Sequence, residues 1–258
     1  MNEEETTITI LGSGTSMGVP EIGCRCAVCR SSDRRDKRLR CSGLIETRDT
    51  KILIDCGPDF RQQALRTNMH SAPDAVLLTH EHYDHIGGID DLRPLSRNHT
   101  VNLYGLERCC HNLKERMPYC FRTDNPSFVP QIRLNSIAPG EAFHINNVRI
   151  EPLNILHGQL PILGYRIGRM AWITDALVIP QESMRKLRGL DLLVMNALHI
   201  RTHPTHQTLD MALENARLIG ARKTVFIHMS HHIGLHKDVD KKLPEGIQLA
   251  YDFMKIKI

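Results

Sequence analysis

The sequence Thr79-His80-Glu81-His82-Tyr83-Asp84-His85 places four potential metal ligands, His80, His82, Asp84 and His85, within six consecutive residues. It follows the apolar residues 75–78, which we interpret as a buried strand. Side chains alternate along an extended chain, so His80 and His82 project to the same side. The chain must then turn, which lets Asp84 and His85 face a second position nearby. One short segment can therefore supply ligands to two adjacent metal ions, and this favours a metal site over a polar loop that is merely rich in histidine.

Length and composition are those of an ordinary soluble globular protein. The chain has 258 residues, enough for one large α/β domain or two small ones, with 41% hydrophobic and 24% charged residues. The net charge of +4 is only mildly basic, so no general affinity for nucleic acid follows. Residues 1–5 are acidic and lack the apolar segment of a secretory signal, and no apolar run approaches the roughly 18 residues of a membrane span. We therefore expect a cytoplasmic protein without a membrane segment.

Predicted strands and helices fall into two successive groups. Strands are expected at 6–11, 44–47, 51–55, 75–78, 101–104, 148–156, 164–167, 170–174, 191–195 and 224–228, and an extended segment at 247–258. Helices are expected at 59–67, 87–97, 109–117 and 208–219, and residues 118–130, which contain three prolines, are expected to be irregular. Because no internal repeat, low-complexity tract or linker is present, we predict one domain covering residues 1–258.

Three further residues suit the same metal site. His157, Asp175 and His228 each lie at the carboxyl end of a predicted strand. Ligand sites commonly form at such strand ends in α/β architectures. One such histidine alone would be an ordinary loop residue, but the three together with residues 80–85 form a coherent ligand set.

These motifs, HEHYDH at 80–85 followed in order by His157, Asp175 and His228, resemble those of the metallo-β-lactamase superfamily. The resemblance implies an α/β fold, a four-layer αββα sandwich, with the site at one edge of its two sheets. It assigns His80, His82 and His157 to one metal, Asp84, His85 and His228 to the other, and Asp175 to both as a bridge.

The chemistry of the ligands agrees with this expectation. Imidazole and carboxylate groups suit zinc, manganese or iron. Two metals roughly 4 Å apart can hold both the attacking and the leaving oxygen of a displacement at phosphorus, and a water that bridges them loses a proton readily. We therefore expect hydrolysis by a metal-bridging hydroxide, with Asp84 as a catalytic metal ligand and no protein nucleophile.

A second metal signature lies near the N-terminus. Cys24-Arg25-Cys26-Ala27-Val28-Cys29 places three thiols in six residues, and cysteines that are not exported stay reduced. A closed structural zinc site needs four ligands, so Cys24, Cys26 and Cys29 require a fourth, for which His231 is the candidate. Three buried thiols without a metal are the less suitable alternative at this spacing.

The cysteine motif narrows the family. CxCxxC after the glycine-rich residues 12–20, with a late HxxH, resembles the phosphoribosyl cyclic phosphodiesterase branch, in which the cysteine cluster and a late histidine bind a structural zinc. The glycine-rich loop lacks the Gly-Lys-Ser/Thr ending of a phosphate loop, so we expect a tight turn that brings the first strand near the metal site.

His206 matches a histidine that acts in the phosphodiesterase branch. It could protonate the leaving oxygen or stabilise the charged phosphoryl oxygens. The alternative is a residue that only leads into the predicted helix at 208–219. His199, His203, His232 and His236 are expected to be surface residues or to support the ligands from behind.

The basic residues 34–40 are interpreted as a solvated face, and the alternative is that one arginine reaches a substrate phosphate.

The leading hypothesis is a dinuclear metal-dependent phosphodiesterase acting on a small, perhaps cyclic, phosphodiester. One alternative is an RNA-processing phosphodiesterase resembling tRNase Z, although no glycine- and lysine-rich insertion is present to grip a tRNA. The other is a non-catalytic binding protein resembling the pyrroloquinoline-quinone biosynthesis B protein, which departs from the ligand pattern found here. A homodimer is expected from family resemblance alone.

Overall fold

Two mixed sheets form the centre of the protein. The computed structural model describes residues 6–97, 99–121 and 129–258, and within these residues each sheet has seven strands. In spatial order the first sheet contains β14 (Met254–Lys257), β1 (Thr7–Gly12), β2 (Ser42–Glu46), β3 (Lys51–Ile54), β4 (Ala75–Leu77), β5 (Val101–Gly105) and β6 (Ile132–Ser136). The second contains β13 (Ile247–Leu249), β12 (Lys223–Ile227), β11 (Leu192–Asn196), β10 (Met170–Ile173), β9 (Leu160–Ile167), β8 (Val148–His157) and β7 (Phe143–Ile145).

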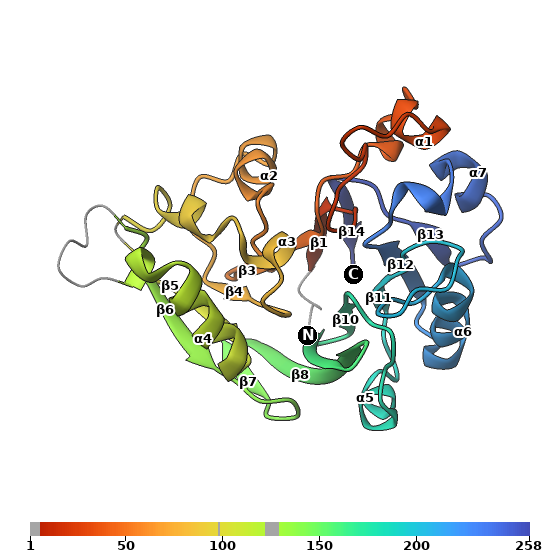
Figure 1. Cartoon of the computed structure of the whole chain (residues 1–258). Helices are drawn as coiled ribbons and strands as arrows, with labels where there is room; N and C mark the ends of the chain where they lie inside the picture. Colours follow the sequence, from red (N-terminus) through yellow and green to blue (C-terminus); the bar gives the residue numbers. More distant parts are fainter. Residues whose placement is uncertain (1–5, 98, 122–128) are drawn as a thin grey trace.

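Seven α-helices occur in the described residues. They are α1 (Ala27–Arg30), α2 (Phe60–Arg66), α3 (Tyr83–Ile86), α4 (Glu107–Arg116), α5 (Gln181–Lys186), α6 (Leu209–Ile219) and α7 (His236–Asp240). Of these, α4, α5, α6 and α7 pack beside strands of the two sheets. Helix α4 packs beside β5 and β6, and α6 packs beside β11, on opposite sides of the molecule (Figure 1). The four-layer αββα sandwich expected from the resemblance is confirmed.

Alternating side chains divide each strand between two cores. Ile52 and Ile54 of β3 lie in the core shared by the two sheets, whereas Leu53 packs in the outer cluster of the first sheet. In β4, Leu77 faces the shared core and Val76 faces outward. Because both faces of these strands are covered, the strand sequences are continuously apolar rather than alternating.

Two hydrogen bonds join the sheets directly before the HEHYDH motif. The Tyr165 hydroxyl on β9 donates to the Leu78 carbonyl at 2.6 Å, and the backbone N–H of Leu163 donates to the Thr79 carbonyl at 2.9 Å. Tyr165 is fully buried, and burial holds its pKa well above the usual range, so the hydroxyl stays a donor. These bonds set the start of the motif against the second sheet.

Several elements differ from the sequence prediction. The helix expected at 87–97 is a short 3-10 helix, Ile89–Leu92, followed by turns. Gly88 lies against the Gly57 carbonyl oxygen, where an added Cβ would lie only 2.0 Å away, so this close approach requires glycine. The extended segment at 247–258 is interrupted between β13 and β14, where Phe253 has a φ of 68°.

Six α-helices and β-strands were not predicted: β6, β7, α5, α7, and the four-residue helices α1 and α3. The edge strands β6 and β7 carry polar residues, and α5 and α7 are only six and five residues long, so neither pair has a clear periodic pattern. Residues 1–5, on which the absence of a secretory signal rests, and residues 122–128 of the expected irregular stretch lie outside the described residues.

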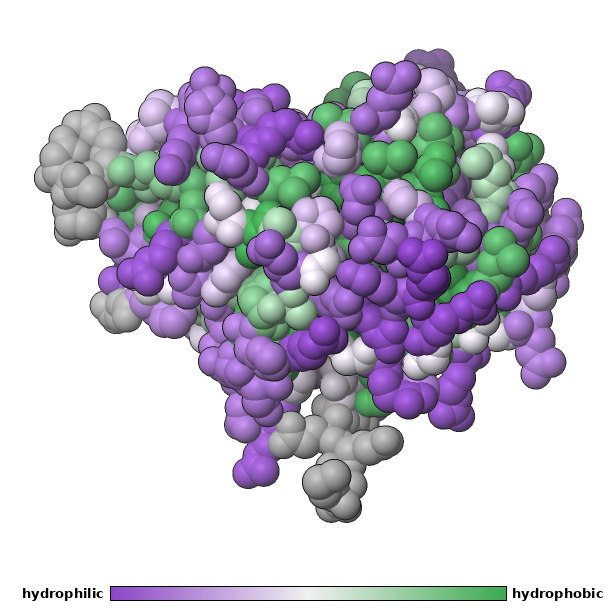
Figure 2. All heavy atoms as spheres, turned by 90° about the horizontal axis from the view of Figure 1, so that it is seen from below, coloured by the Kyte–Doolittle hydropathy of each residue, from purple (hydrophilic) through white to green (hydrophobic). Residues whose placement is uncertain are grey.

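None of the helices in the described part of the chain has the length and hydrophobicity needed to cross a membrane. On the face seen from below, hydrophilic residues cover most of the area, with smaller hydrophobic areas between them (Figure 2).

We predict that Tyr165→Phe lowers the free energy of unfolding by about 1–3 kcal/mol, because the buried Leu78 carbonyl loses its hydrogen-bond donor. Chemical denaturation measured by circular dichroism checks this. The matched control is Tyr104→Phe, since the half-buried Tyr104 stacks on Phe143 but makes no hydroxyl hydrogen bond within the described residues. Equal stability of the two variants would contradict the prediction.

Candidate metal centres

All seven candidate ligands lie together at one edge of the two sheets. His80 follows β4, and α3, which carries Asp84 and His85, comes directly after it; α3 lies between the two halves of the molecule (Figure 1). From the second sheet, His157 ends β8, and Asp175 and His228 follow β10 and β12. Elements far apart in the sequence therefore bring their polar ends to one place.

The backbone is strained at three of these strand ends. Asp55, Asp175 and His228 have φ values of 58°, 56° and 55°, in the left-handed region that non-glycine residues rarely adopt. Each residue directly follows a strand or lies one residue beyond it. Such strain persists only where the surrounding structure imposes it, and it gathers at functional sites.

One group of four buried residues has the spacing of a metal site. Ligand atoms of Asp84, His85, Asp175 and His228 all lie within 4.8 Å of one another. The His85 Nε2 atom is 3.1 Å from Asp84 Oδ2, and the His228 Nε2 atom is 3.1 Å from Asp175 Oδ1. Atoms bound to one tetrahedral zinc at about 2.1 Å would lie roughly 3.4 Å apart, close to these distances.

The remaining candidate ligands form two overlapping groups around Asp175. One group contains His80, His82 and Asp175, with His80 Nε2 and His82 Nδ1 only 2.9 Å apart. The other contains His157, Asp175 and His206. Asp175 belongs to every group, which is the position that a bridging carboxylate would occupy. His206 lies nearer to the ligand set than the sequence indicated.

Unpaired polar atoms make this cluster suited to cations. Asp84 Oδ2, His85 Nε2 and both ring nitrogens of His228 are buried without a hydrogen bond of normal geometry to any described residue. Buried polar atoms are nearly always paired, and each exception needs an explanation. A divalent metal ion would satisfy Asp84 Oδ2, His85 Nε2 and His228 Nε2, the three of these atoms that face one another.

The charges of the buried groups also favour the binding of cations. Burial is the main reason why the pKa of His80 lies well below its usual range, followed by the nearby His85. Burial also opposes protonation of His85, but the carboxylates of Asp84, Asp175 and Asp55 outweigh it and raise the pKa of that ring. A buried centre with three carboxylates therefore attracts positive charge, which divalent ions would supply.

Asp55 was not identified from the sequence. Its Oδ2 atom accepts a hydrogen bond from Nδ1 of His85 at 2.7 Å, and its carboxylate also accepts bonds from the backbone and hydroxyl of Thr79 at 2.8 Å. With Nδ1 bound to a carboxylate, Nε2 of His85 is the nitrogen free to bind a metal. The available signal was an aspartate directly after an apolar strand.

His206 faces the ligand cluster. Its ring centroid lies 4.6 Å from that of His157 and 5.0 Å from that of His228, and its Nδ1 is 3.8 Å from Asp175 Oδ2. The role of leading into α6 belongs instead to Thr208, whose side chain accepts a hydrogen bond from the N–H of Met211. Burial, more than any neighbour, lowers the pKa of His206 to about 3, so its ring is neutral near pH 7.

The cysteine cluster meets His231 as the spacing suggested. Nδ1 of His231 lies 3.2, 3.4 and 3.2 Å from the Sγ atoms of Cys24, Cys26 and Cys29. Atoms bound to one tetrahedral zinc through sulfur and nitrogen would lie about 3.6 Å apart. The backbone N–H of Cys29 bonds to the Cys26 sulfur and lowers the pKa of that thiol, which favours the thiolate form that binds metals.

Glu21 was also missed by sequence reasoning. Its Oε2 atom lies 3.4 Å from Nε2 of His231, opposite the ring nitrogen that faces the three thiols. Carboxylates in this position orient metal-binding imidazoles and raise their basicity.

The glycine-rich loop is attached to the segment between the two metal centres. The N–H of Met229, next to His228, donates to the Ser13 carbonyl at 3.0 Å, and the N–H of Thr15 donates to the Met229 carbonyl at 3.1 Å. The loop thus brings β1 against the metal site, as expected.

The interpretation of residues 34–40 as a solvated face is wrong for Arg38. This side chain is only 3% exposed and donates hydrogen bonds to Ser13 Oγ and to the Ala250 carbonyl. Arg40 also faces inward in part, where it pairs with Asp59 and donates to the Ser16 carbonyl. Both residues brace the glycine-rich loop, a role that the run of charges conceals.

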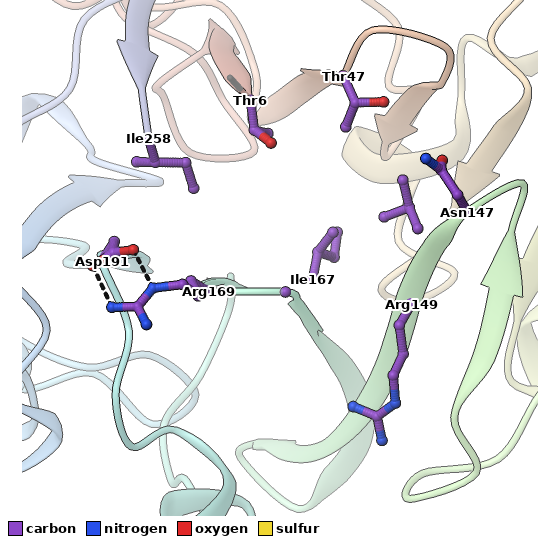
Figure 3. A pocket seen from close by; sticks show the side chains of 10 residues that line it. Thr6, Thr47, Asn147, Arg149, Ile167, Arg169, Asp191 and Ile258 are labelled. Atoms are coloured by element: carbon purple, nitrogen blue, oxygen red, sulfur yellow. Dashed lines mark hydrogen bonds and ion pairs between the residues drawn. The ribbon is translucent and has the colours of Figure 1, made fainter. Parts of the chain in front are cut away.

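A separate pocket of about 340 Å³ lies at the opposite end of the sandwich (Figure 3). Its lining includes Val148, at the start of β8, whereas His157 ends that strand nine residues later, roughly 30 Å away. Within this pocket the Arg169 side chain is bound to Asp191. The pocket is therefore distinct from the candidate metal centres.

Comparison with known proteins identifies the family. Residues 50–229 match the family model described as the beta-lactamase superfamily domain. A solved structure described as a new diphosphatase from the PhnP family is 43% identical, over 98% of this chain and 97% of that one, with a TM-score of 0.91. This chain belongs to the PhnP family of the beta-lactamase superfamily. The resemblance inferred from the motifs is thereby confirmed, and the fold implies bound divalent metal ions.

Two other similar proteins have different names. A protein named octanoyltransferase from Porphyromonas gingivalis is 47% identical over 245 residues, which is 94% of this chain but 50% of the relative. The chain thus spans about half the length of that relative. The zinc-bound PqqB structure from Methylobacterium extorquens is 18% identical, over 98% of this chain and 100% of that one, with a TM-score of 0.80, and shares the fold.

We predict that Cys26→Ser removes about one zinc per chain from the purified protein and lowers its melting temperature. The exposed Cys26 contributes little packing, so the loss would reflect ligation. Elemental analysis and thermal unfolding check this. The control is Cys110→Ser, a buried cysteine whose hydrogen bond to the Gly105 carbonyl a serine can keep. Unchanged zinc content in Cys26→Ser would contradict the prediction.

Proposed function

We propose that this protein is a metal-dependent hydrolase that cleaves a phosphoric ester linkage in a small molecule, with a phosphodiester as the leading substrate class. The observation that carries the proposal is the buried ligand cluster with unpaired atoms, in which Asp175 is common to every group and His206 lies alongside. Its donors are imidazoles and carboxylates, which suit zinc, manganese or iron.

Each candidate ligand would have a defined place. His80, His82 and His157 would hold one ion, Asp84, His85 and His228 the other, and Asp175 both. Paired divalent ions supply an activated water and positive charge at the phosphoryl oxygens. Asp55 fixes the ring of His85, and the carbonyls of Asp175 and Thr205 accept the Nδ1 hydrogen of His157 at 2.9 and 3.1 Å, so Nε2 of each ring is directed to the centre.

His206 would contact the substrate as a neutral hydrogen-bond donor. A ring whose pKa is about 3 is neutral near pH 7, so it does not hold the extra proton that a general acid would give to the leaving oxygen. A neutral imidazole N–H beside the phosphoryl group can stabilise the negative charge that develops there. Of the two roles suggested by the sequence, the buried position favours this one.

The comparisons support hydrolysis at phosphorus and leave two substrate classes. The 43% identical structure is described as a diphosphatase, which favours a diphosphate linkage as a second candidate beside the phosphodiester. The name octanoyltransferase belongs to a protein of twice the matched length, so it does not by itself assign acyl transfer to the half matched here.

We expect the metal-loaded protein to hydrolyse bis(p-nitrophenyl) phosphate and Asp84→Ala to lose at least about 100-fold in kcat/KM, because a ligand and its charge are removed. A chelator should abolish turnover, and added zinc or manganese should restore it. Release of p-nitrophenol measures both effects. Asp210→Ala, an exposed carboxylate at the start of α6, is the matched control. Turnover that survives both chelation and Asp84→Ala would refute the proposal.

His206→Ala should lower kcat by about 100- to 1,000-fold, the usual loss when a donor to a developing charge is removed. His206→Gln, which keeps an N–H donor, should recover part of this loss. A group with a pKa of about 3 does not titrate between pH 5 and 8. The pH dependence of kcat over this range should therefore be the same in the wild type and in His206→Gln. Steady-state kinetics over this range, with metal content measured at each pH, provides the check.

A further inference from the structure

Two histidines continue outward from His206 along the loop between β11 and α6. The ring centroid of His203 lies 5.0 Å from that of His206, and the ring centroid of His199 lies 5.8 Å from that of His203. Both side chains are half-buried. We call His199 and His203 the outer histidine pair. The pair extends the site away from the candidate metal ligands.

Hydrogen bonds from the backbone determine which nitrogen of each ring carries hydrogen. The N–H of Arg201 donates to Nδ1 of His199 at 3.1 Å, and the N–H of Thr205 donates to Nδ1 of His203 at 3.3 Å. A nitrogen that accepts a hydrogen bond has no hydrogen of its own, so in the neutral ring the hydrogen is on Nε2. Each ring therefore presents an Nε2–H donor.

The hydrogen bonds from the backbone to Nδ1 make the outer histidine pair unsuited to metal binding. A metal bound at Nε2 would require the ring hydrogen to be on Nδ1. There it would point at the backbone N–H hydrogen of Arg201 or Thr205, and the hydrogen bond would be lost. The outer pair differs in this respect from His206, whose Nδ1 is buried and unpaired. Donation to an anion is the chemistry that remains.

The loop holds the pair at a fixed place relative to the candidate metal centre. The Thr205 carbonyl accepts a hydrogen bond from Nδ1 of His157, while the N–H of the same residue donates to His203. One residue thus joins a candidate metal ligand to a member of the outer pair. The two Nε2–H donors are positioned by the backbone, and no ordering of flexible side chains is needed.

We propose that the outer histidine pair forms a second anion subsite, which binds a phosphate adjoining the one that is cleaved. The proposal rests on the proposed function and narrows its substrate class to diphosphate diesters. A substrate with a single phosphodiester and neutral ester groups has no second charged group to accept hydrogen bonds from the two Nε2–H donors. If it covered these donors they would lose water without gaining a partner, which costs binding energy. A diphosphate places a second charged group beside the first.

The reaction then balances as a hydrolysis. Water adds its hydroxyl to the phosphorus held at the metal centre, the bond from that phosphorus to the bridging oxygen breaks, and the remaining proton goes to the released phosphate. The products are two phosphate monoesters. The outer pair would hold the released phosphate through the Nε2–H groups of both rings.

The test compares inhibition by one and by two phosphates. Inorganic phosphate and methylenediphosphonate, which is not hydrolysed, are measured as inhibitors of bis(p-nitrophenyl) phosphate turnover by the metal-loaded protein. In the wild type the diphosphonate should bind more tightly than phosphate. His199→Ala/His203→Ala should raise the inhibition constant of the diphosphonate by about tenfold or more, and that of phosphate by less than about threefold. His203→Gln, whose amide can donate from near the position of Nε2, should recover part of the difference.

The control is the variant His144→Ala. His144 is an exposed residue of β7, and this strand pairs with the start of β8, at the opposite end from His157. It should change neither inhibition constant, and metal chelation by the diphosphonate would affect all variants equally. Equal changes for both inhibitors, or none for the diphosphonate, would overturn the subsite. If bis(p-nitrophenyl) phosphate is not hydrolysed, calorimetric titration of the metal-loaded proteins gives the same comparison. A selective loss of diphosphonate binding would then support the subsite although the proposed function had failed.

Discussion

Three carboxylates, those of Asp55, Asp84 and Asp175, are buried within one small volume, and the arrangement of the strand ends follows from the need to hold them there. Buried negative charges repel one another and lose hydration, so they persist only beside compensating positive charge. The left-handed backbone at Asp55 and Asp175 and the hydrogen bonds that join the sheets at residues 78–79 hold the groups in place. With divalent cations bound there, stability and chemistry would depend on the same interaction, the attraction between this centre and the cations.

The two metal centres are parts of one assembly. His228 and His231 lie three residues apart, and Met229 between them is hydrogen-bonded to the glycine-rich loop. A zinc held by the three cysteines and His231 would therefore fix the end of β12, where His228 leaves the sheet. Arg38 braces the other side of the loop through Ser13. Loss of the structural site would for this reason disturb the catalytic site as well as the fold.

The sequence was informative where chemistry is local, and less so where it depends on folding. The HEHYDH motif was visible because its ligands are contiguous, and His157, Asp175 and His228 could be found because each ends an apolar strand. Asp55 and Glu21 were missed because their partners are 30 and 210 residues away. Arg38 was misjudged because a run of charges normally faces water, whereas here backbone carbonyls and hydroxyls solvate the guanidinium in the interior.

Thr205 supports both His157 and His203 with main-chain atoms, and its hydroxyl adds only a further contact to Nδ1 of His203. Its side chain could therefore be exchanged without breaking either bond, provided that the peptide keeps its conformation. A substitution at this position would thus leave the ring of His157 behind it in register. An ancestral site of this construction could acquire new substrates by small changes in one loop, and related chains with similar metal ligands would be expected to differ most in what they cleave.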